Sequence, residues 1–396
     1  MEFENSNSKK THKKIWLLLL FVSGVIVGFM MRFAVGFIGN KAYGMSIQEY
    51  LDLNAFMDMT KSYYYMNTDD VDYNLGMKKG IVEALGDPYS KYLSKEEFDK
   101  MMEDTLGEFV GIGLYLAPTS DGKIGVIAPI KGSPAKDAGI ESGDIILSVN
   151  GKNYDANTMD EAVRNMKGKK GEKVTLEILS TDKKIKKVTV TKTDIHPETV
   201  NSKILDNKIG YMQIISFEDR THREFSENLK NLQSKGINSL IIDLRSNPGG
   251  LVDQVVKIAD DILPQAMIVY TENKDGKQQK YMSDDKNKLD LPIVVLVDKG
   301  SASASEILAA ALQDNKKATI VGTNTFGKGI IQSVMELKDG TGLVITTAQY
   351  FTPNGNMVHK IGIKPDIEVK YDPNTGYDNQ LKKAIEVIID KIQKLK

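Results

Sequence analysis

The sequence contains no cysteine, which excludes a disulfide framework, a thiolate metal site and a cysteine nucleophile. Histidine is almost as scarce, because the 396 residues include only His12, His196, His222 and His359. Any reaction that needs a general base therefore has few histidines available. The chain also lacks an excess of either charge, with 52 Lys and Arg, 53 Asp and Glu, and a formal net charge of −1. This balance gives no electrostatic case for nucleic acid as a partner.

One long apolar run lies near the amino terminus. Lysines at positions 9, 10, 13 and 14 precede Ile15–Met31, a stretch of 17 residues without a charge. Arg32 interrupts the run, which resumes over Phe33–Ile38. The pattern predicts a cytoplasmic tail over 1–14, a single transmembrane anchor over 15–38 in the cytoplasmic membrane, and a catalytic part on the extracytoplasmic side. A cleaved signal peptide is the alternative, although no convincing cleavage site follows the apolar core.

A cluster of three serines marks a turn between a strand and a helix. Pro292 to Val297 is a short β-branched run typical of a buried strand, and a helical pattern begins after Ser303. Glu306 follows Ser303 by three positions, which predicts a capping box at the start of that helix. Backbone N–H groups are free at such a helix start. A Ser303 hydroxyl placed there could attack a carbonyl group, because these donors would meet the developing oxyanion.

A serine nucleophile needs a base beside it, and no histidine lies in this stretch. Lys328, between Gly327 and Gly329, is the better candidate, because burial would lower the pKa of its ammonium group. Gln332 lies four residues further along a predicted strand. It would therefore point to the same face as Lys328 and could hold the amine.

These motifs resemble those of the carboxyl-terminal processing peptidases, the tail-specific proteases that use a Ser/Lys dyad. The resemblance rests on Ser-Ala-Ser-Ala-Ser-Glu over 301–306 and Thr-Phe-Gly-Lys-Gly over 325–329. It implies that Ser303 is the nucleophile, Lys328 the base and Gln332 a support for the lysine, with a lesser role for Asp314. It implies no metal and no organic cofactor. Ser301 and Ser305 are rival nucleophiles that we expect to cap the helix instead.

The resemblance also identifies an oxyanion hole. Asp-Leu-Arg-Ser-Asn-Pro-Gly-Gly over 243–250 is similar to a family turn that donates one N–H group to the hole. The residue after the nucleophile donates another. These roles would fall on Gly249 or Gly250 and on Ala304. The alternative is that paired glycines at a strand–helix junction have only a steric role.

A β-rich module precedes these motifs and resembles a PDZ domain nearly throughout. Such domains add a peptide as an extra strand at a sheet edge and hold its carboxylate with backbone N–H groups. The resemblance also places Lys167 where many family members have an arginine. The alternative is that the glycines at the start of the module merely open its first strand. The resemblance places the peptide grip at four residues, Gly111, Ile112, Gly113 and Leu114.

The predicted architecture is α/β, and the resemblance implies a crotonase-like protease core with an inserted PDZ domain. We expect an N-terminal helical region over 45–105, the PDZ domain over 106–193, the serine protease core over 194–370 and a C-terminal helix over 371–396. The helical region is equally a spacer or a homodimer contact.

Two other motif-like patterns give little support for a nucleotide site or a calcium site. The phosphate-loop pattern at Gly322–Lys328 lacks the following Ser or Thr, and the acidic stretch at Asp70 lacks the glycine and glutamate of a calcium loop.

Together these features predict a membrane-anchored serine endopeptidase. Its PDZ domain would recognise the free, apolar carboxyl termini of protein or peptide substrates, and the dyad would cut the chain through an acyl-enzyme. The competing hypothesis is a non-catalytic PDZ scaffold that binds carboxyl-terminal peptides without cleaving them.

Overall fold

The structure is a computed structural model that describes residues 23–24, 26–28, 30, 46–284 and 286–394. The chain divides into two compact units, Met1–Gly80 and Ile81–Lys396. The first contains α2 (Ile47–Tyr63), which begins at a reciprocal capping box. The Ser46 hydroxyl accepts the Glu49 N–H at 3.2 Å, and the Glu49 carboxylate accepts the Ser46 N–H at 2.6 Å. The next helix, α3 (Tyr73–Glu83), crosses the boundary between the two units.

Within the described ranges, no helix is both long enough and apolar enough to cross a bilayer. This finding contradicts the predicted localisation in the cytoplasmic membrane with the catalytic part on the extracytoplasmic side, and it gives no support to the transmembrane anchor predicted over 15–38. Helix α2 carries Glu49, Asp52 and Lys61, charges that a bilayer core disfavours. The predicted tail over 1–14 and most of 15–38 lie outside the described residues.

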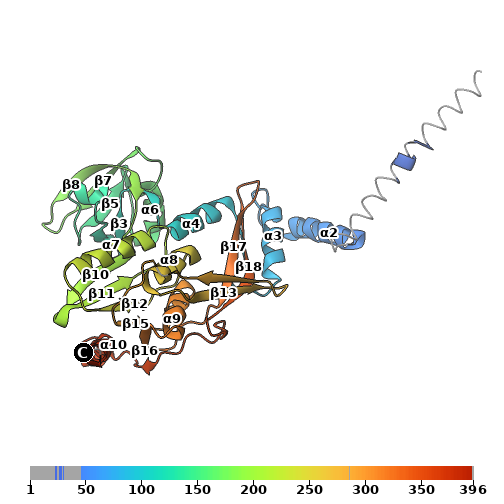
Figure 1. Cartoon of the computed structure of the whole chain (residues 1–396). Helices are drawn as coiled ribbons and strands as arrows, with labels where there is room; N and C mark the ends of the chain where they lie inside the picture. The colour runs from blue at the N-terminus through green and yellow to red at the C-terminus, as the bar shows by residue number, and fades with distance from the viewer. Residues whose placement is uncertain (1–22, 25, 29, 31–45, 285, 395–396) are drawn as a thin grey trace, which may run out of the picture. The chain divides into compact units, whose positions relative to one another are not determined.

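The centre of the second unit is a six-stranded sheet in the order β10-β11-β12-β15-β16-β19 (Figure 1). Strands β11, β12, β15, β16 and β19 are mutually parallel, and β10 is antiparallel to β11. Strands buried on both faces explain the continuous apolar runs of the sequence. The bounds are β10 Val200–Leu205, β11 Ile209–Ile214, β12 Ser239–Asp243, β15 Ile293–Val297, β16 Ala318–Gly322 and β19 Ile367–Glu368.

Helices cover both faces of this sheet. Apolar side chains of α7, α8 and α9 form the main core with one face, and α10 packs on the other. Ala, Ile and Leu line α9 almost without interruption, and every residue from Ala304 to Leu312 is buried. The core therefore fixes the start of α9 firmly against the sheet. The bounds are α7 Thr221–Ser234, α8 Val252–Ile262, α9 Ala304–Asp314 and α10 Asn379–Lys394.

A second sheet of five strands supplies the other wall of the site described below. Strand β18 pairs with β1, β13 and β17, and β14 pairs with β13. Helix α4 (Lys95–Leu106) follows β1 after a capping box formed by Ser94 and Glu97. The strands are β1 Lys91–Leu93, β13 Met267–Asn273, β14 Gln278–Met282, β17 Ile330–Glu336 and β18 Gly342–Phe351.

The β-rich module, predicted over 106–193, has its own hydrophobic core. Its six-stranded sheet has the strand order β3-β4-β5-β7-β8, and β6 pairs with β5. Strands β2 (Phe109–Gly111) and β9 (Thr193–Ile195) form a separate antiparallel pair at the two ends of the module's sequence. The remaining elements are β3 Leu114–Pro118, β4 Ile124–Pro129, α5 Pro134–Asp137, β5 Ile145–Val149, β6 Lys152–Asn153, α6 Met159–Met166, β7 Lys173–Leu179 and β8 Ile185–Thr191. Short 3-10 turns lie at Ala156–Thr158, Asp206–Lys208 and Pro373–Thr375.

Candidate active site

A cavity of about 550 Å³ in the second unit brings the predicted nucleophile and base to one place. Ser303, Lys328 and Gln332 all line it. The segment before β1, the helix α4, the turn before α8 and strands β17 and β18 complete its walls. The other lining residues that matter below are Tyr89, Lys91, Glu97, Gly250 and Tyr350.

Ser303 stands at a strained turn immediately before α9. Its backbone has φ 54° and ψ −114°, a region that non-glycine residues rarely adopt and that costs about 1–3 kcal/mol. The buried helix that follows holds the residue in this conformation. Within the described residues, the Ser303 hydroxyl makes no capping hydrogen bond, although Ser303 and Glu306 stand in the capping-box arrangement. The hydroxyl is thus half-buried at the cavity, where it could serve as a nucleophile once a base comes within hydrogen-bonding reach.

A single buried carboxylate joins the serine turn to the lysine segment. Glu306 is fully buried, and its oxygens accept the backbone N–H groups of Ser303 and Lys328, each at 2.9 Å. They also accept the N–H of Gly327 at 2.7 Å and the hydroxyl of Thr325 at 2.6 Å. These donors compensate for the burial of a charge. The predicted contact from Glu306 back to Ser303 is therefore present, and the same carboxylate also binds the lysine loop.

Tyr350 of β18 connects the same two segments from the opposite side. Its hydroxyl donates to the carbonyl oxygen of Lys328 at 2.6 Å and lies 3.1 Å from that of Ser303. Burial and the neighbouring Glu306 carboxylate raise the pKa of this phenol well above its usual value. The phenol therefore stays protonated and serves as a donor. It has no local sequence signal, since it lies 47 residues after the serine it contacts.

Lys328 is half-buried, and burial lowers the pKa of its ammonium group. The positive charge of Lys91 lowers that pKa further, while Asp87 and Glu306 oppose the shift. The Nζ atom lies 5.1 Å from the centre of the Tyr89 ring. No hydrogen bond joins this nitrogen to Ser303 in the described part of the chain. The structure thus brings both groups of the predicted dyad to one cavity without connecting them directly.

Gln332 lies on β17 opposite Thr346 of β18. Its amide nitrogen donates to the Thr346 hydroxyl at 3.2 Å. The amide nitrogen therefore has a fixed partner on β18, and the side chain lines the cavity.

The predicted oxyanion donors differ in availability. The N–H of Gly249 already donates to the side-chain oxygen of Asn247 at 2.8 Å. Gly250 lines the cavity, and Ala304 is the first residue of α9. Among the described residues, no hydrogen bond occupies the N–H of either one. A Cβ atom at Gly249 would lie 2.7 Å from that of Ser303, so the glycine turn packs directly against the serine turn.

The rival serines and Asp314 have structural partners. Both serines are fully buried: the Ser301 hydroxyl donates to the carbonyl oxygen of Leu244 at 2.8 Å, and the Ser305 hydroxyl donates to that of Asn247 at 3.1 Å. Asp314 accepts the Thr352 hydroxyl at 2.6 Å at the far end of α9. None of the three lines the cavity.

In the PDZ module, the four residues predicted to hold a peptide carboxylate line a groove of about 240 Å³. Gly113 has φ 80°, and a Cβ atom there would lie 2.3 Å from that of Ser133, so only glycine fits. Lys167 also lines the groove, and its ammonium contacts the Glu103 carboxylate of α4 at 2.5 Å. The grip residues are Gly111, Ile112, Gly113 and Leu114.

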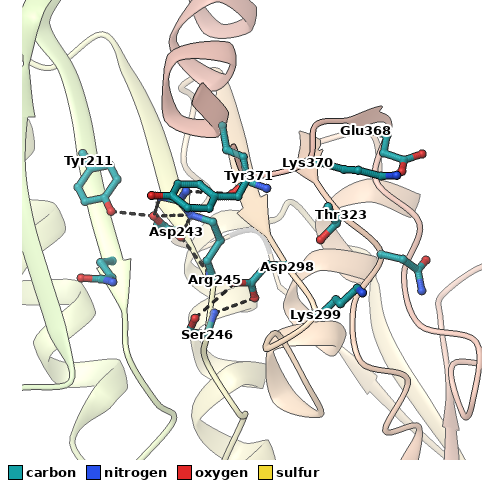
Figure 2. Close-up of a pocket in the computed structure, with 13 residues that line it drawn as sticks. Tyr211, Asp243, Arg245, Ser246, Asp298, Lys299, Thr323, Glu368, Lys370 and Tyr371 are labelled. Atoms are coloured by element: carbon teal, nitrogen blue, oxygen red, sulfur yellow. Dashed lines mark hydrogen bonds and ion pairs between the residues drawn. The ribbon is translucent and has the colours of Figure 1, made fainter. Parts of the chain in front are cut away.

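A second cavity of about 790 Å³ is larger than the one that contains Ser303, and it lies at the carboxyl ends of β12, β15 and β16 (Figure 2). In one wall, Arg245 contacts Asp243 at 2.6 Å and Asp378 at 2.8 Å, and so ties the start of α10 to the sheet. In its floor, Asp298 accepts the N–H of Ser246 at 2.8 Å. Asp243, Arg245 and Asp298 are thus engaged in structural contacts. The predicted nucleophile and base both line the smaller cavity, and we locate the chemistry there.

Asp298 also has a role that the sequence reading missed. It accepts the N–H groups of Gly300 at 2.9 Å and Ser301 at 3.1 Å, which closes the turn that leads to Ser303. An aspartate two residues before a glycine is a local signal for such a turn. Among the described residues, no group of three or more His, Asp or Glu side chains is placed to hold a metal ion.

Comparison with known proteins agrees with this geometry. The model of Peptidase family S41 matches residues 208–369, and a PDZ domain model matches residues 125–180. The chain is 36% identical over 365 residues to the carboxy-terminal processing protease CtpA of Bacillus subtilis, an alignment that covers 91% of this chain and 78% of that protein. It is 39% identical over 292 residues to a carboxyl-terminal-processing protease of Synechocystis, with 72% and 68% covered.

A solved structure from Bacteroides fragilis that is assigned to the S41 proteases shares the fold, with a TM-score of 0.53 and 17% identity over 84% of this chain and 93% of that one. The expectation of a serine peptidase, made from the serine and lysine motifs, and that of a PDZ domain, made from the β-rich module, are confirmed at the level of the family. The chain belongs to the carboxy-terminal processing serine proteases of peptidase family S41.

Proposed function

We propose that the protein is an endopeptidase in which Ser303 attacks the peptide carbonyl and Lys328 acts as the general base. One observation carries this proposal: Glu306 binds the backbone N–H groups of both residues, and both side chains line the same cavity. One buried carboxylate that binds both segments holds the backbone of Ser303 at a fixed separation from the backbone of Lys328. Such preorganisation reduces the entropic cost of reaching the transition state.

Lys328 would carry out every proton transfer of the reaction. Neutral Lys328 takes the proton of the Ser303 hydroxyl as the oxygen bonds to the carbonyl carbon, and it then gives that proton to the leaving amine. The acyl-enzyme ester that remains is hydrolysed by water, with the lysine again accepting and returning a proton. Lys328 must turn from the Tyr89 ring toward Ser303, a movement that substrate binding often completes.

For the oxyanion we propose the N–H groups of Ala304 and Gly250. The N–H of Gly249 is occupied by Asn247, which supports Gly250 as the second donor. Gln332 would accept a hydrogen from Lys328 and so direct the amine toward Ser303. Asp314, bonded to Thr352, is left with a structural role.

The PDZ domain would select the substrate. We propose that free, apolar carboxyl termini bind in the groove formed by the glycine-rich loop and α6, where Val163 and Met166 offer an apolar wall. The crotonase-like arrangement of the core belongs to the same proposal. It is compatible with a sheet covered on both faces by helices.

Incubation with an unstructured protein that ends in apolar residues tests this function. Wild type should cleave it, Ser303→Ala and Lys328→Met should not, and Ser234→Ala, an exposed serine on α7, should cleave like wild type. Equal proteolysis by Ser303→Ala would remove the mechanism. Binding of the same carboxyl terminus without cleavage by any form would favour the PDZ scaffold instead.

A further inference from the structure

A short turn before β1 reaches into the wall of the active-site cavity. Asp87 accepts the hydroxyl of Ser90 at 2.6 Å and the backbone N–H of Tyr89 at 3.0 Å. Its Oδ2 atom also accepts the hydroxyl of Thr346 at 2.6 Å, a residue 259 positions away on β18. The Ser90 hydroxyl in turn accepts the backbone N–H of Thr346 at 3.0 Å. The turn is therefore bound to β18 at two points.

Thr346 connects Asp87 to Gln332, the residue proposed to support Lys328. An ionised carboxylate can only accept hydrogen bonds, so the Thr346 hydroxyl must donate its one hydrogen to Asp87. Its lone pairs are then directed to the Gln332 amide, whose NH₂ group donates to them at 3.2 Å. The direction of the first bond therefore decides the orientation of the amide. With its nitrogen turned to Thr346, Gln332 presents its carbonyl oxygen to the cavity.

This orientation matters because an ammonium or amine of Lys328 can donate to a carbonyl oxygen but not to an NH₂ group. A reversed amide would repel the ammonium form of Lys328, and it would donate a hydrogen to the lone pair that the neutral amine needs for the Ser303 proton. Asp87 remains ionised because, although burial raises its pKa, hydrogen bonds from Ser90 and Thr346 outweigh that effect and lower it. His359 also lowers the pKa of this carboxyl.

We propose that Asp87 is a positioning residue for catalysis, which acts through Thr346 to present the carbonyl oxygen of Gln332 to Lys328. The same turn carries Tyr89, whose ring lies 5.1 Å from the lysine nitrogen, so Asp87 also places the group that the lysine faces at rest. The inference rests on the proposed role of Lys328 as the base. It assigns a catalytic purpose to a segment far from the serine and lysine motifs.

Other charged and titratable groups face Lys328, and the test must separate them from Asp87. They come from the segment before α4, from α4 itself, from α9 and from β18, and they are Tyr89, Lys91, Glu97, Glu306 and Tyr350. A variant that breaks the relay while leaving all these charges in place isolates the effect of orientation. Thr346→Val is such a variant, because valine matches threonine in shape and lacks the hydroxyl.

The test compares steady-state cleavage of one peptide substrate by the full chain and its variants. Thr346→Val should lower kcat on the order of 100-fold, because a misdirected base costs about that much, and should leave KM nearly unchanged. Thr346→Ser, which restores the hydroxyl, should recover most of the loss. Thr347→Val is the matched control: its exposed hydroxyl contacts Ser333 on the same strand pair, and it should behave like wild type.

Asp87→Asn separates orientation from charge. It should lower kcat as Thr346→Val does, and it should also move the ascending limb of the pH profile of kcat/KM to lower pH, because it removes a negative charge that favours protonated Lys328. Thr346→Val should leave that limb in place. An active wild type with Thr346→Val at full kcat would overturn the relay. No cleavage by wild type would instead overturn the proposed function, so the two failures are distinguishable.

Discussion

The Oε2 atom of Glu306 lies 2.9 Å from the backbone nitrogen of Lys328. The same oxygen accepts the N–H of Ser303, so the loop that carries the base and the turn that carries the nucleophile share one buried anchor. The position of one residue relative to the other thus depends on a group that takes no part in the chemistry. This dependence has consequences for stability and for activity.

Replacement of Glu306 should lower both the stability of the fold and the rate of cleavage. Glu306→Gln keeps the shape of the side chain but turns two hydrogens toward N–H donors that then lose their acceptor. We expect the free energy of unfolding to fall by about 3 kcal/mol, measured by urea denaturation, and cleavage to be lost. The control Glu336→Gln, at an exposed position on β17, should leave both values unchanged. Wild-type stability in Glu306→Gln would show that the buried carboxylate does not connect the two segments.

The pH dependence of cleavage should report the neutral lysine. Burial and Lys91 lower the pKa of Lys328 below its usual value of 10.5. The base is active when deprotonated, so kcat/KM should rise with pH through that lowered pKa and level off before pH 10.5 is reached. A profile that begins to rise only above pH 10.5 would refute a depressed pKa.

Replacement of Lys91 provides a more selective test of the lowered pKa of Lys328. Lys91→Met removes a positive charge that opposes protonation of Lys328, so the pKa of Lys328 should increase and the ascending limb should move to higher pH. Lys95→Met, which removes an exposed lysine paired with Asp99 on α4, should not move it. A limb that stays in place in Lys91→Met would mean that the two ammonium groups do not interact.

The glycine turn beside Ser303 tolerates no side chain. Gly249 has φ 102°, and an added Cβ would lie 2.7 Å from the Ser303 Cβ and from the Ala302 carbonyl oxygen. Gly249→Ala should therefore lower stability by more than the roughly 1–2 kcal/mol of its backbone conformation, and it should reduce kcat sharply. Gly276→Ala, also at positive φ but with nothing within 4 Å, measures the conformational part alone. Equal losses in the two variants would exclude a clash at the serine turn.

Local patterns in the sequence predicted the local structure well. The spacing of Ser303 and Glu306 indicated a helix start, and the structure begins α9 at Ala304. The family and the PDZ domain followed from short motifs and are confirmed by the comparisons. The predicted membrane anchor is wrong for the part of the chain that the structure describes. The apolar run near the amino terminus predicts a span from hydropathy alone, and most of that run lies outside the described residues.

Contacts across long sequence distances could not be predicted in this way. Tyr350 reaches Ser303 from β18, and Thr346 reaches Asp87 from the far end of the chain. Such contacts depend on which strands pair, and no periodicity encodes that choice. The sequence also does not show that the Gly249 N–H is unavailable to an oxyanion. Its acceptor is the side chain of Asn247, and only the folded turn brings the two together. The sequence therefore identifies the reacting groups, and the structure identifies what positions them.

The central claim is that Ser303 carries the acyl group during turnover. Its most direct test is to quench the enzyme in acid while it hydrolyses a peptide ester, and to measure the mass of the intact chain and of its proteolytic fragments. We predict an added mass equal to the acyl group, located on Ser303 and absent from both Ser303→Ala and Lys328→Met. An acyl group on Ser301 or Ser305, or on any residue of the Ser303→Ala protein, would contradict it.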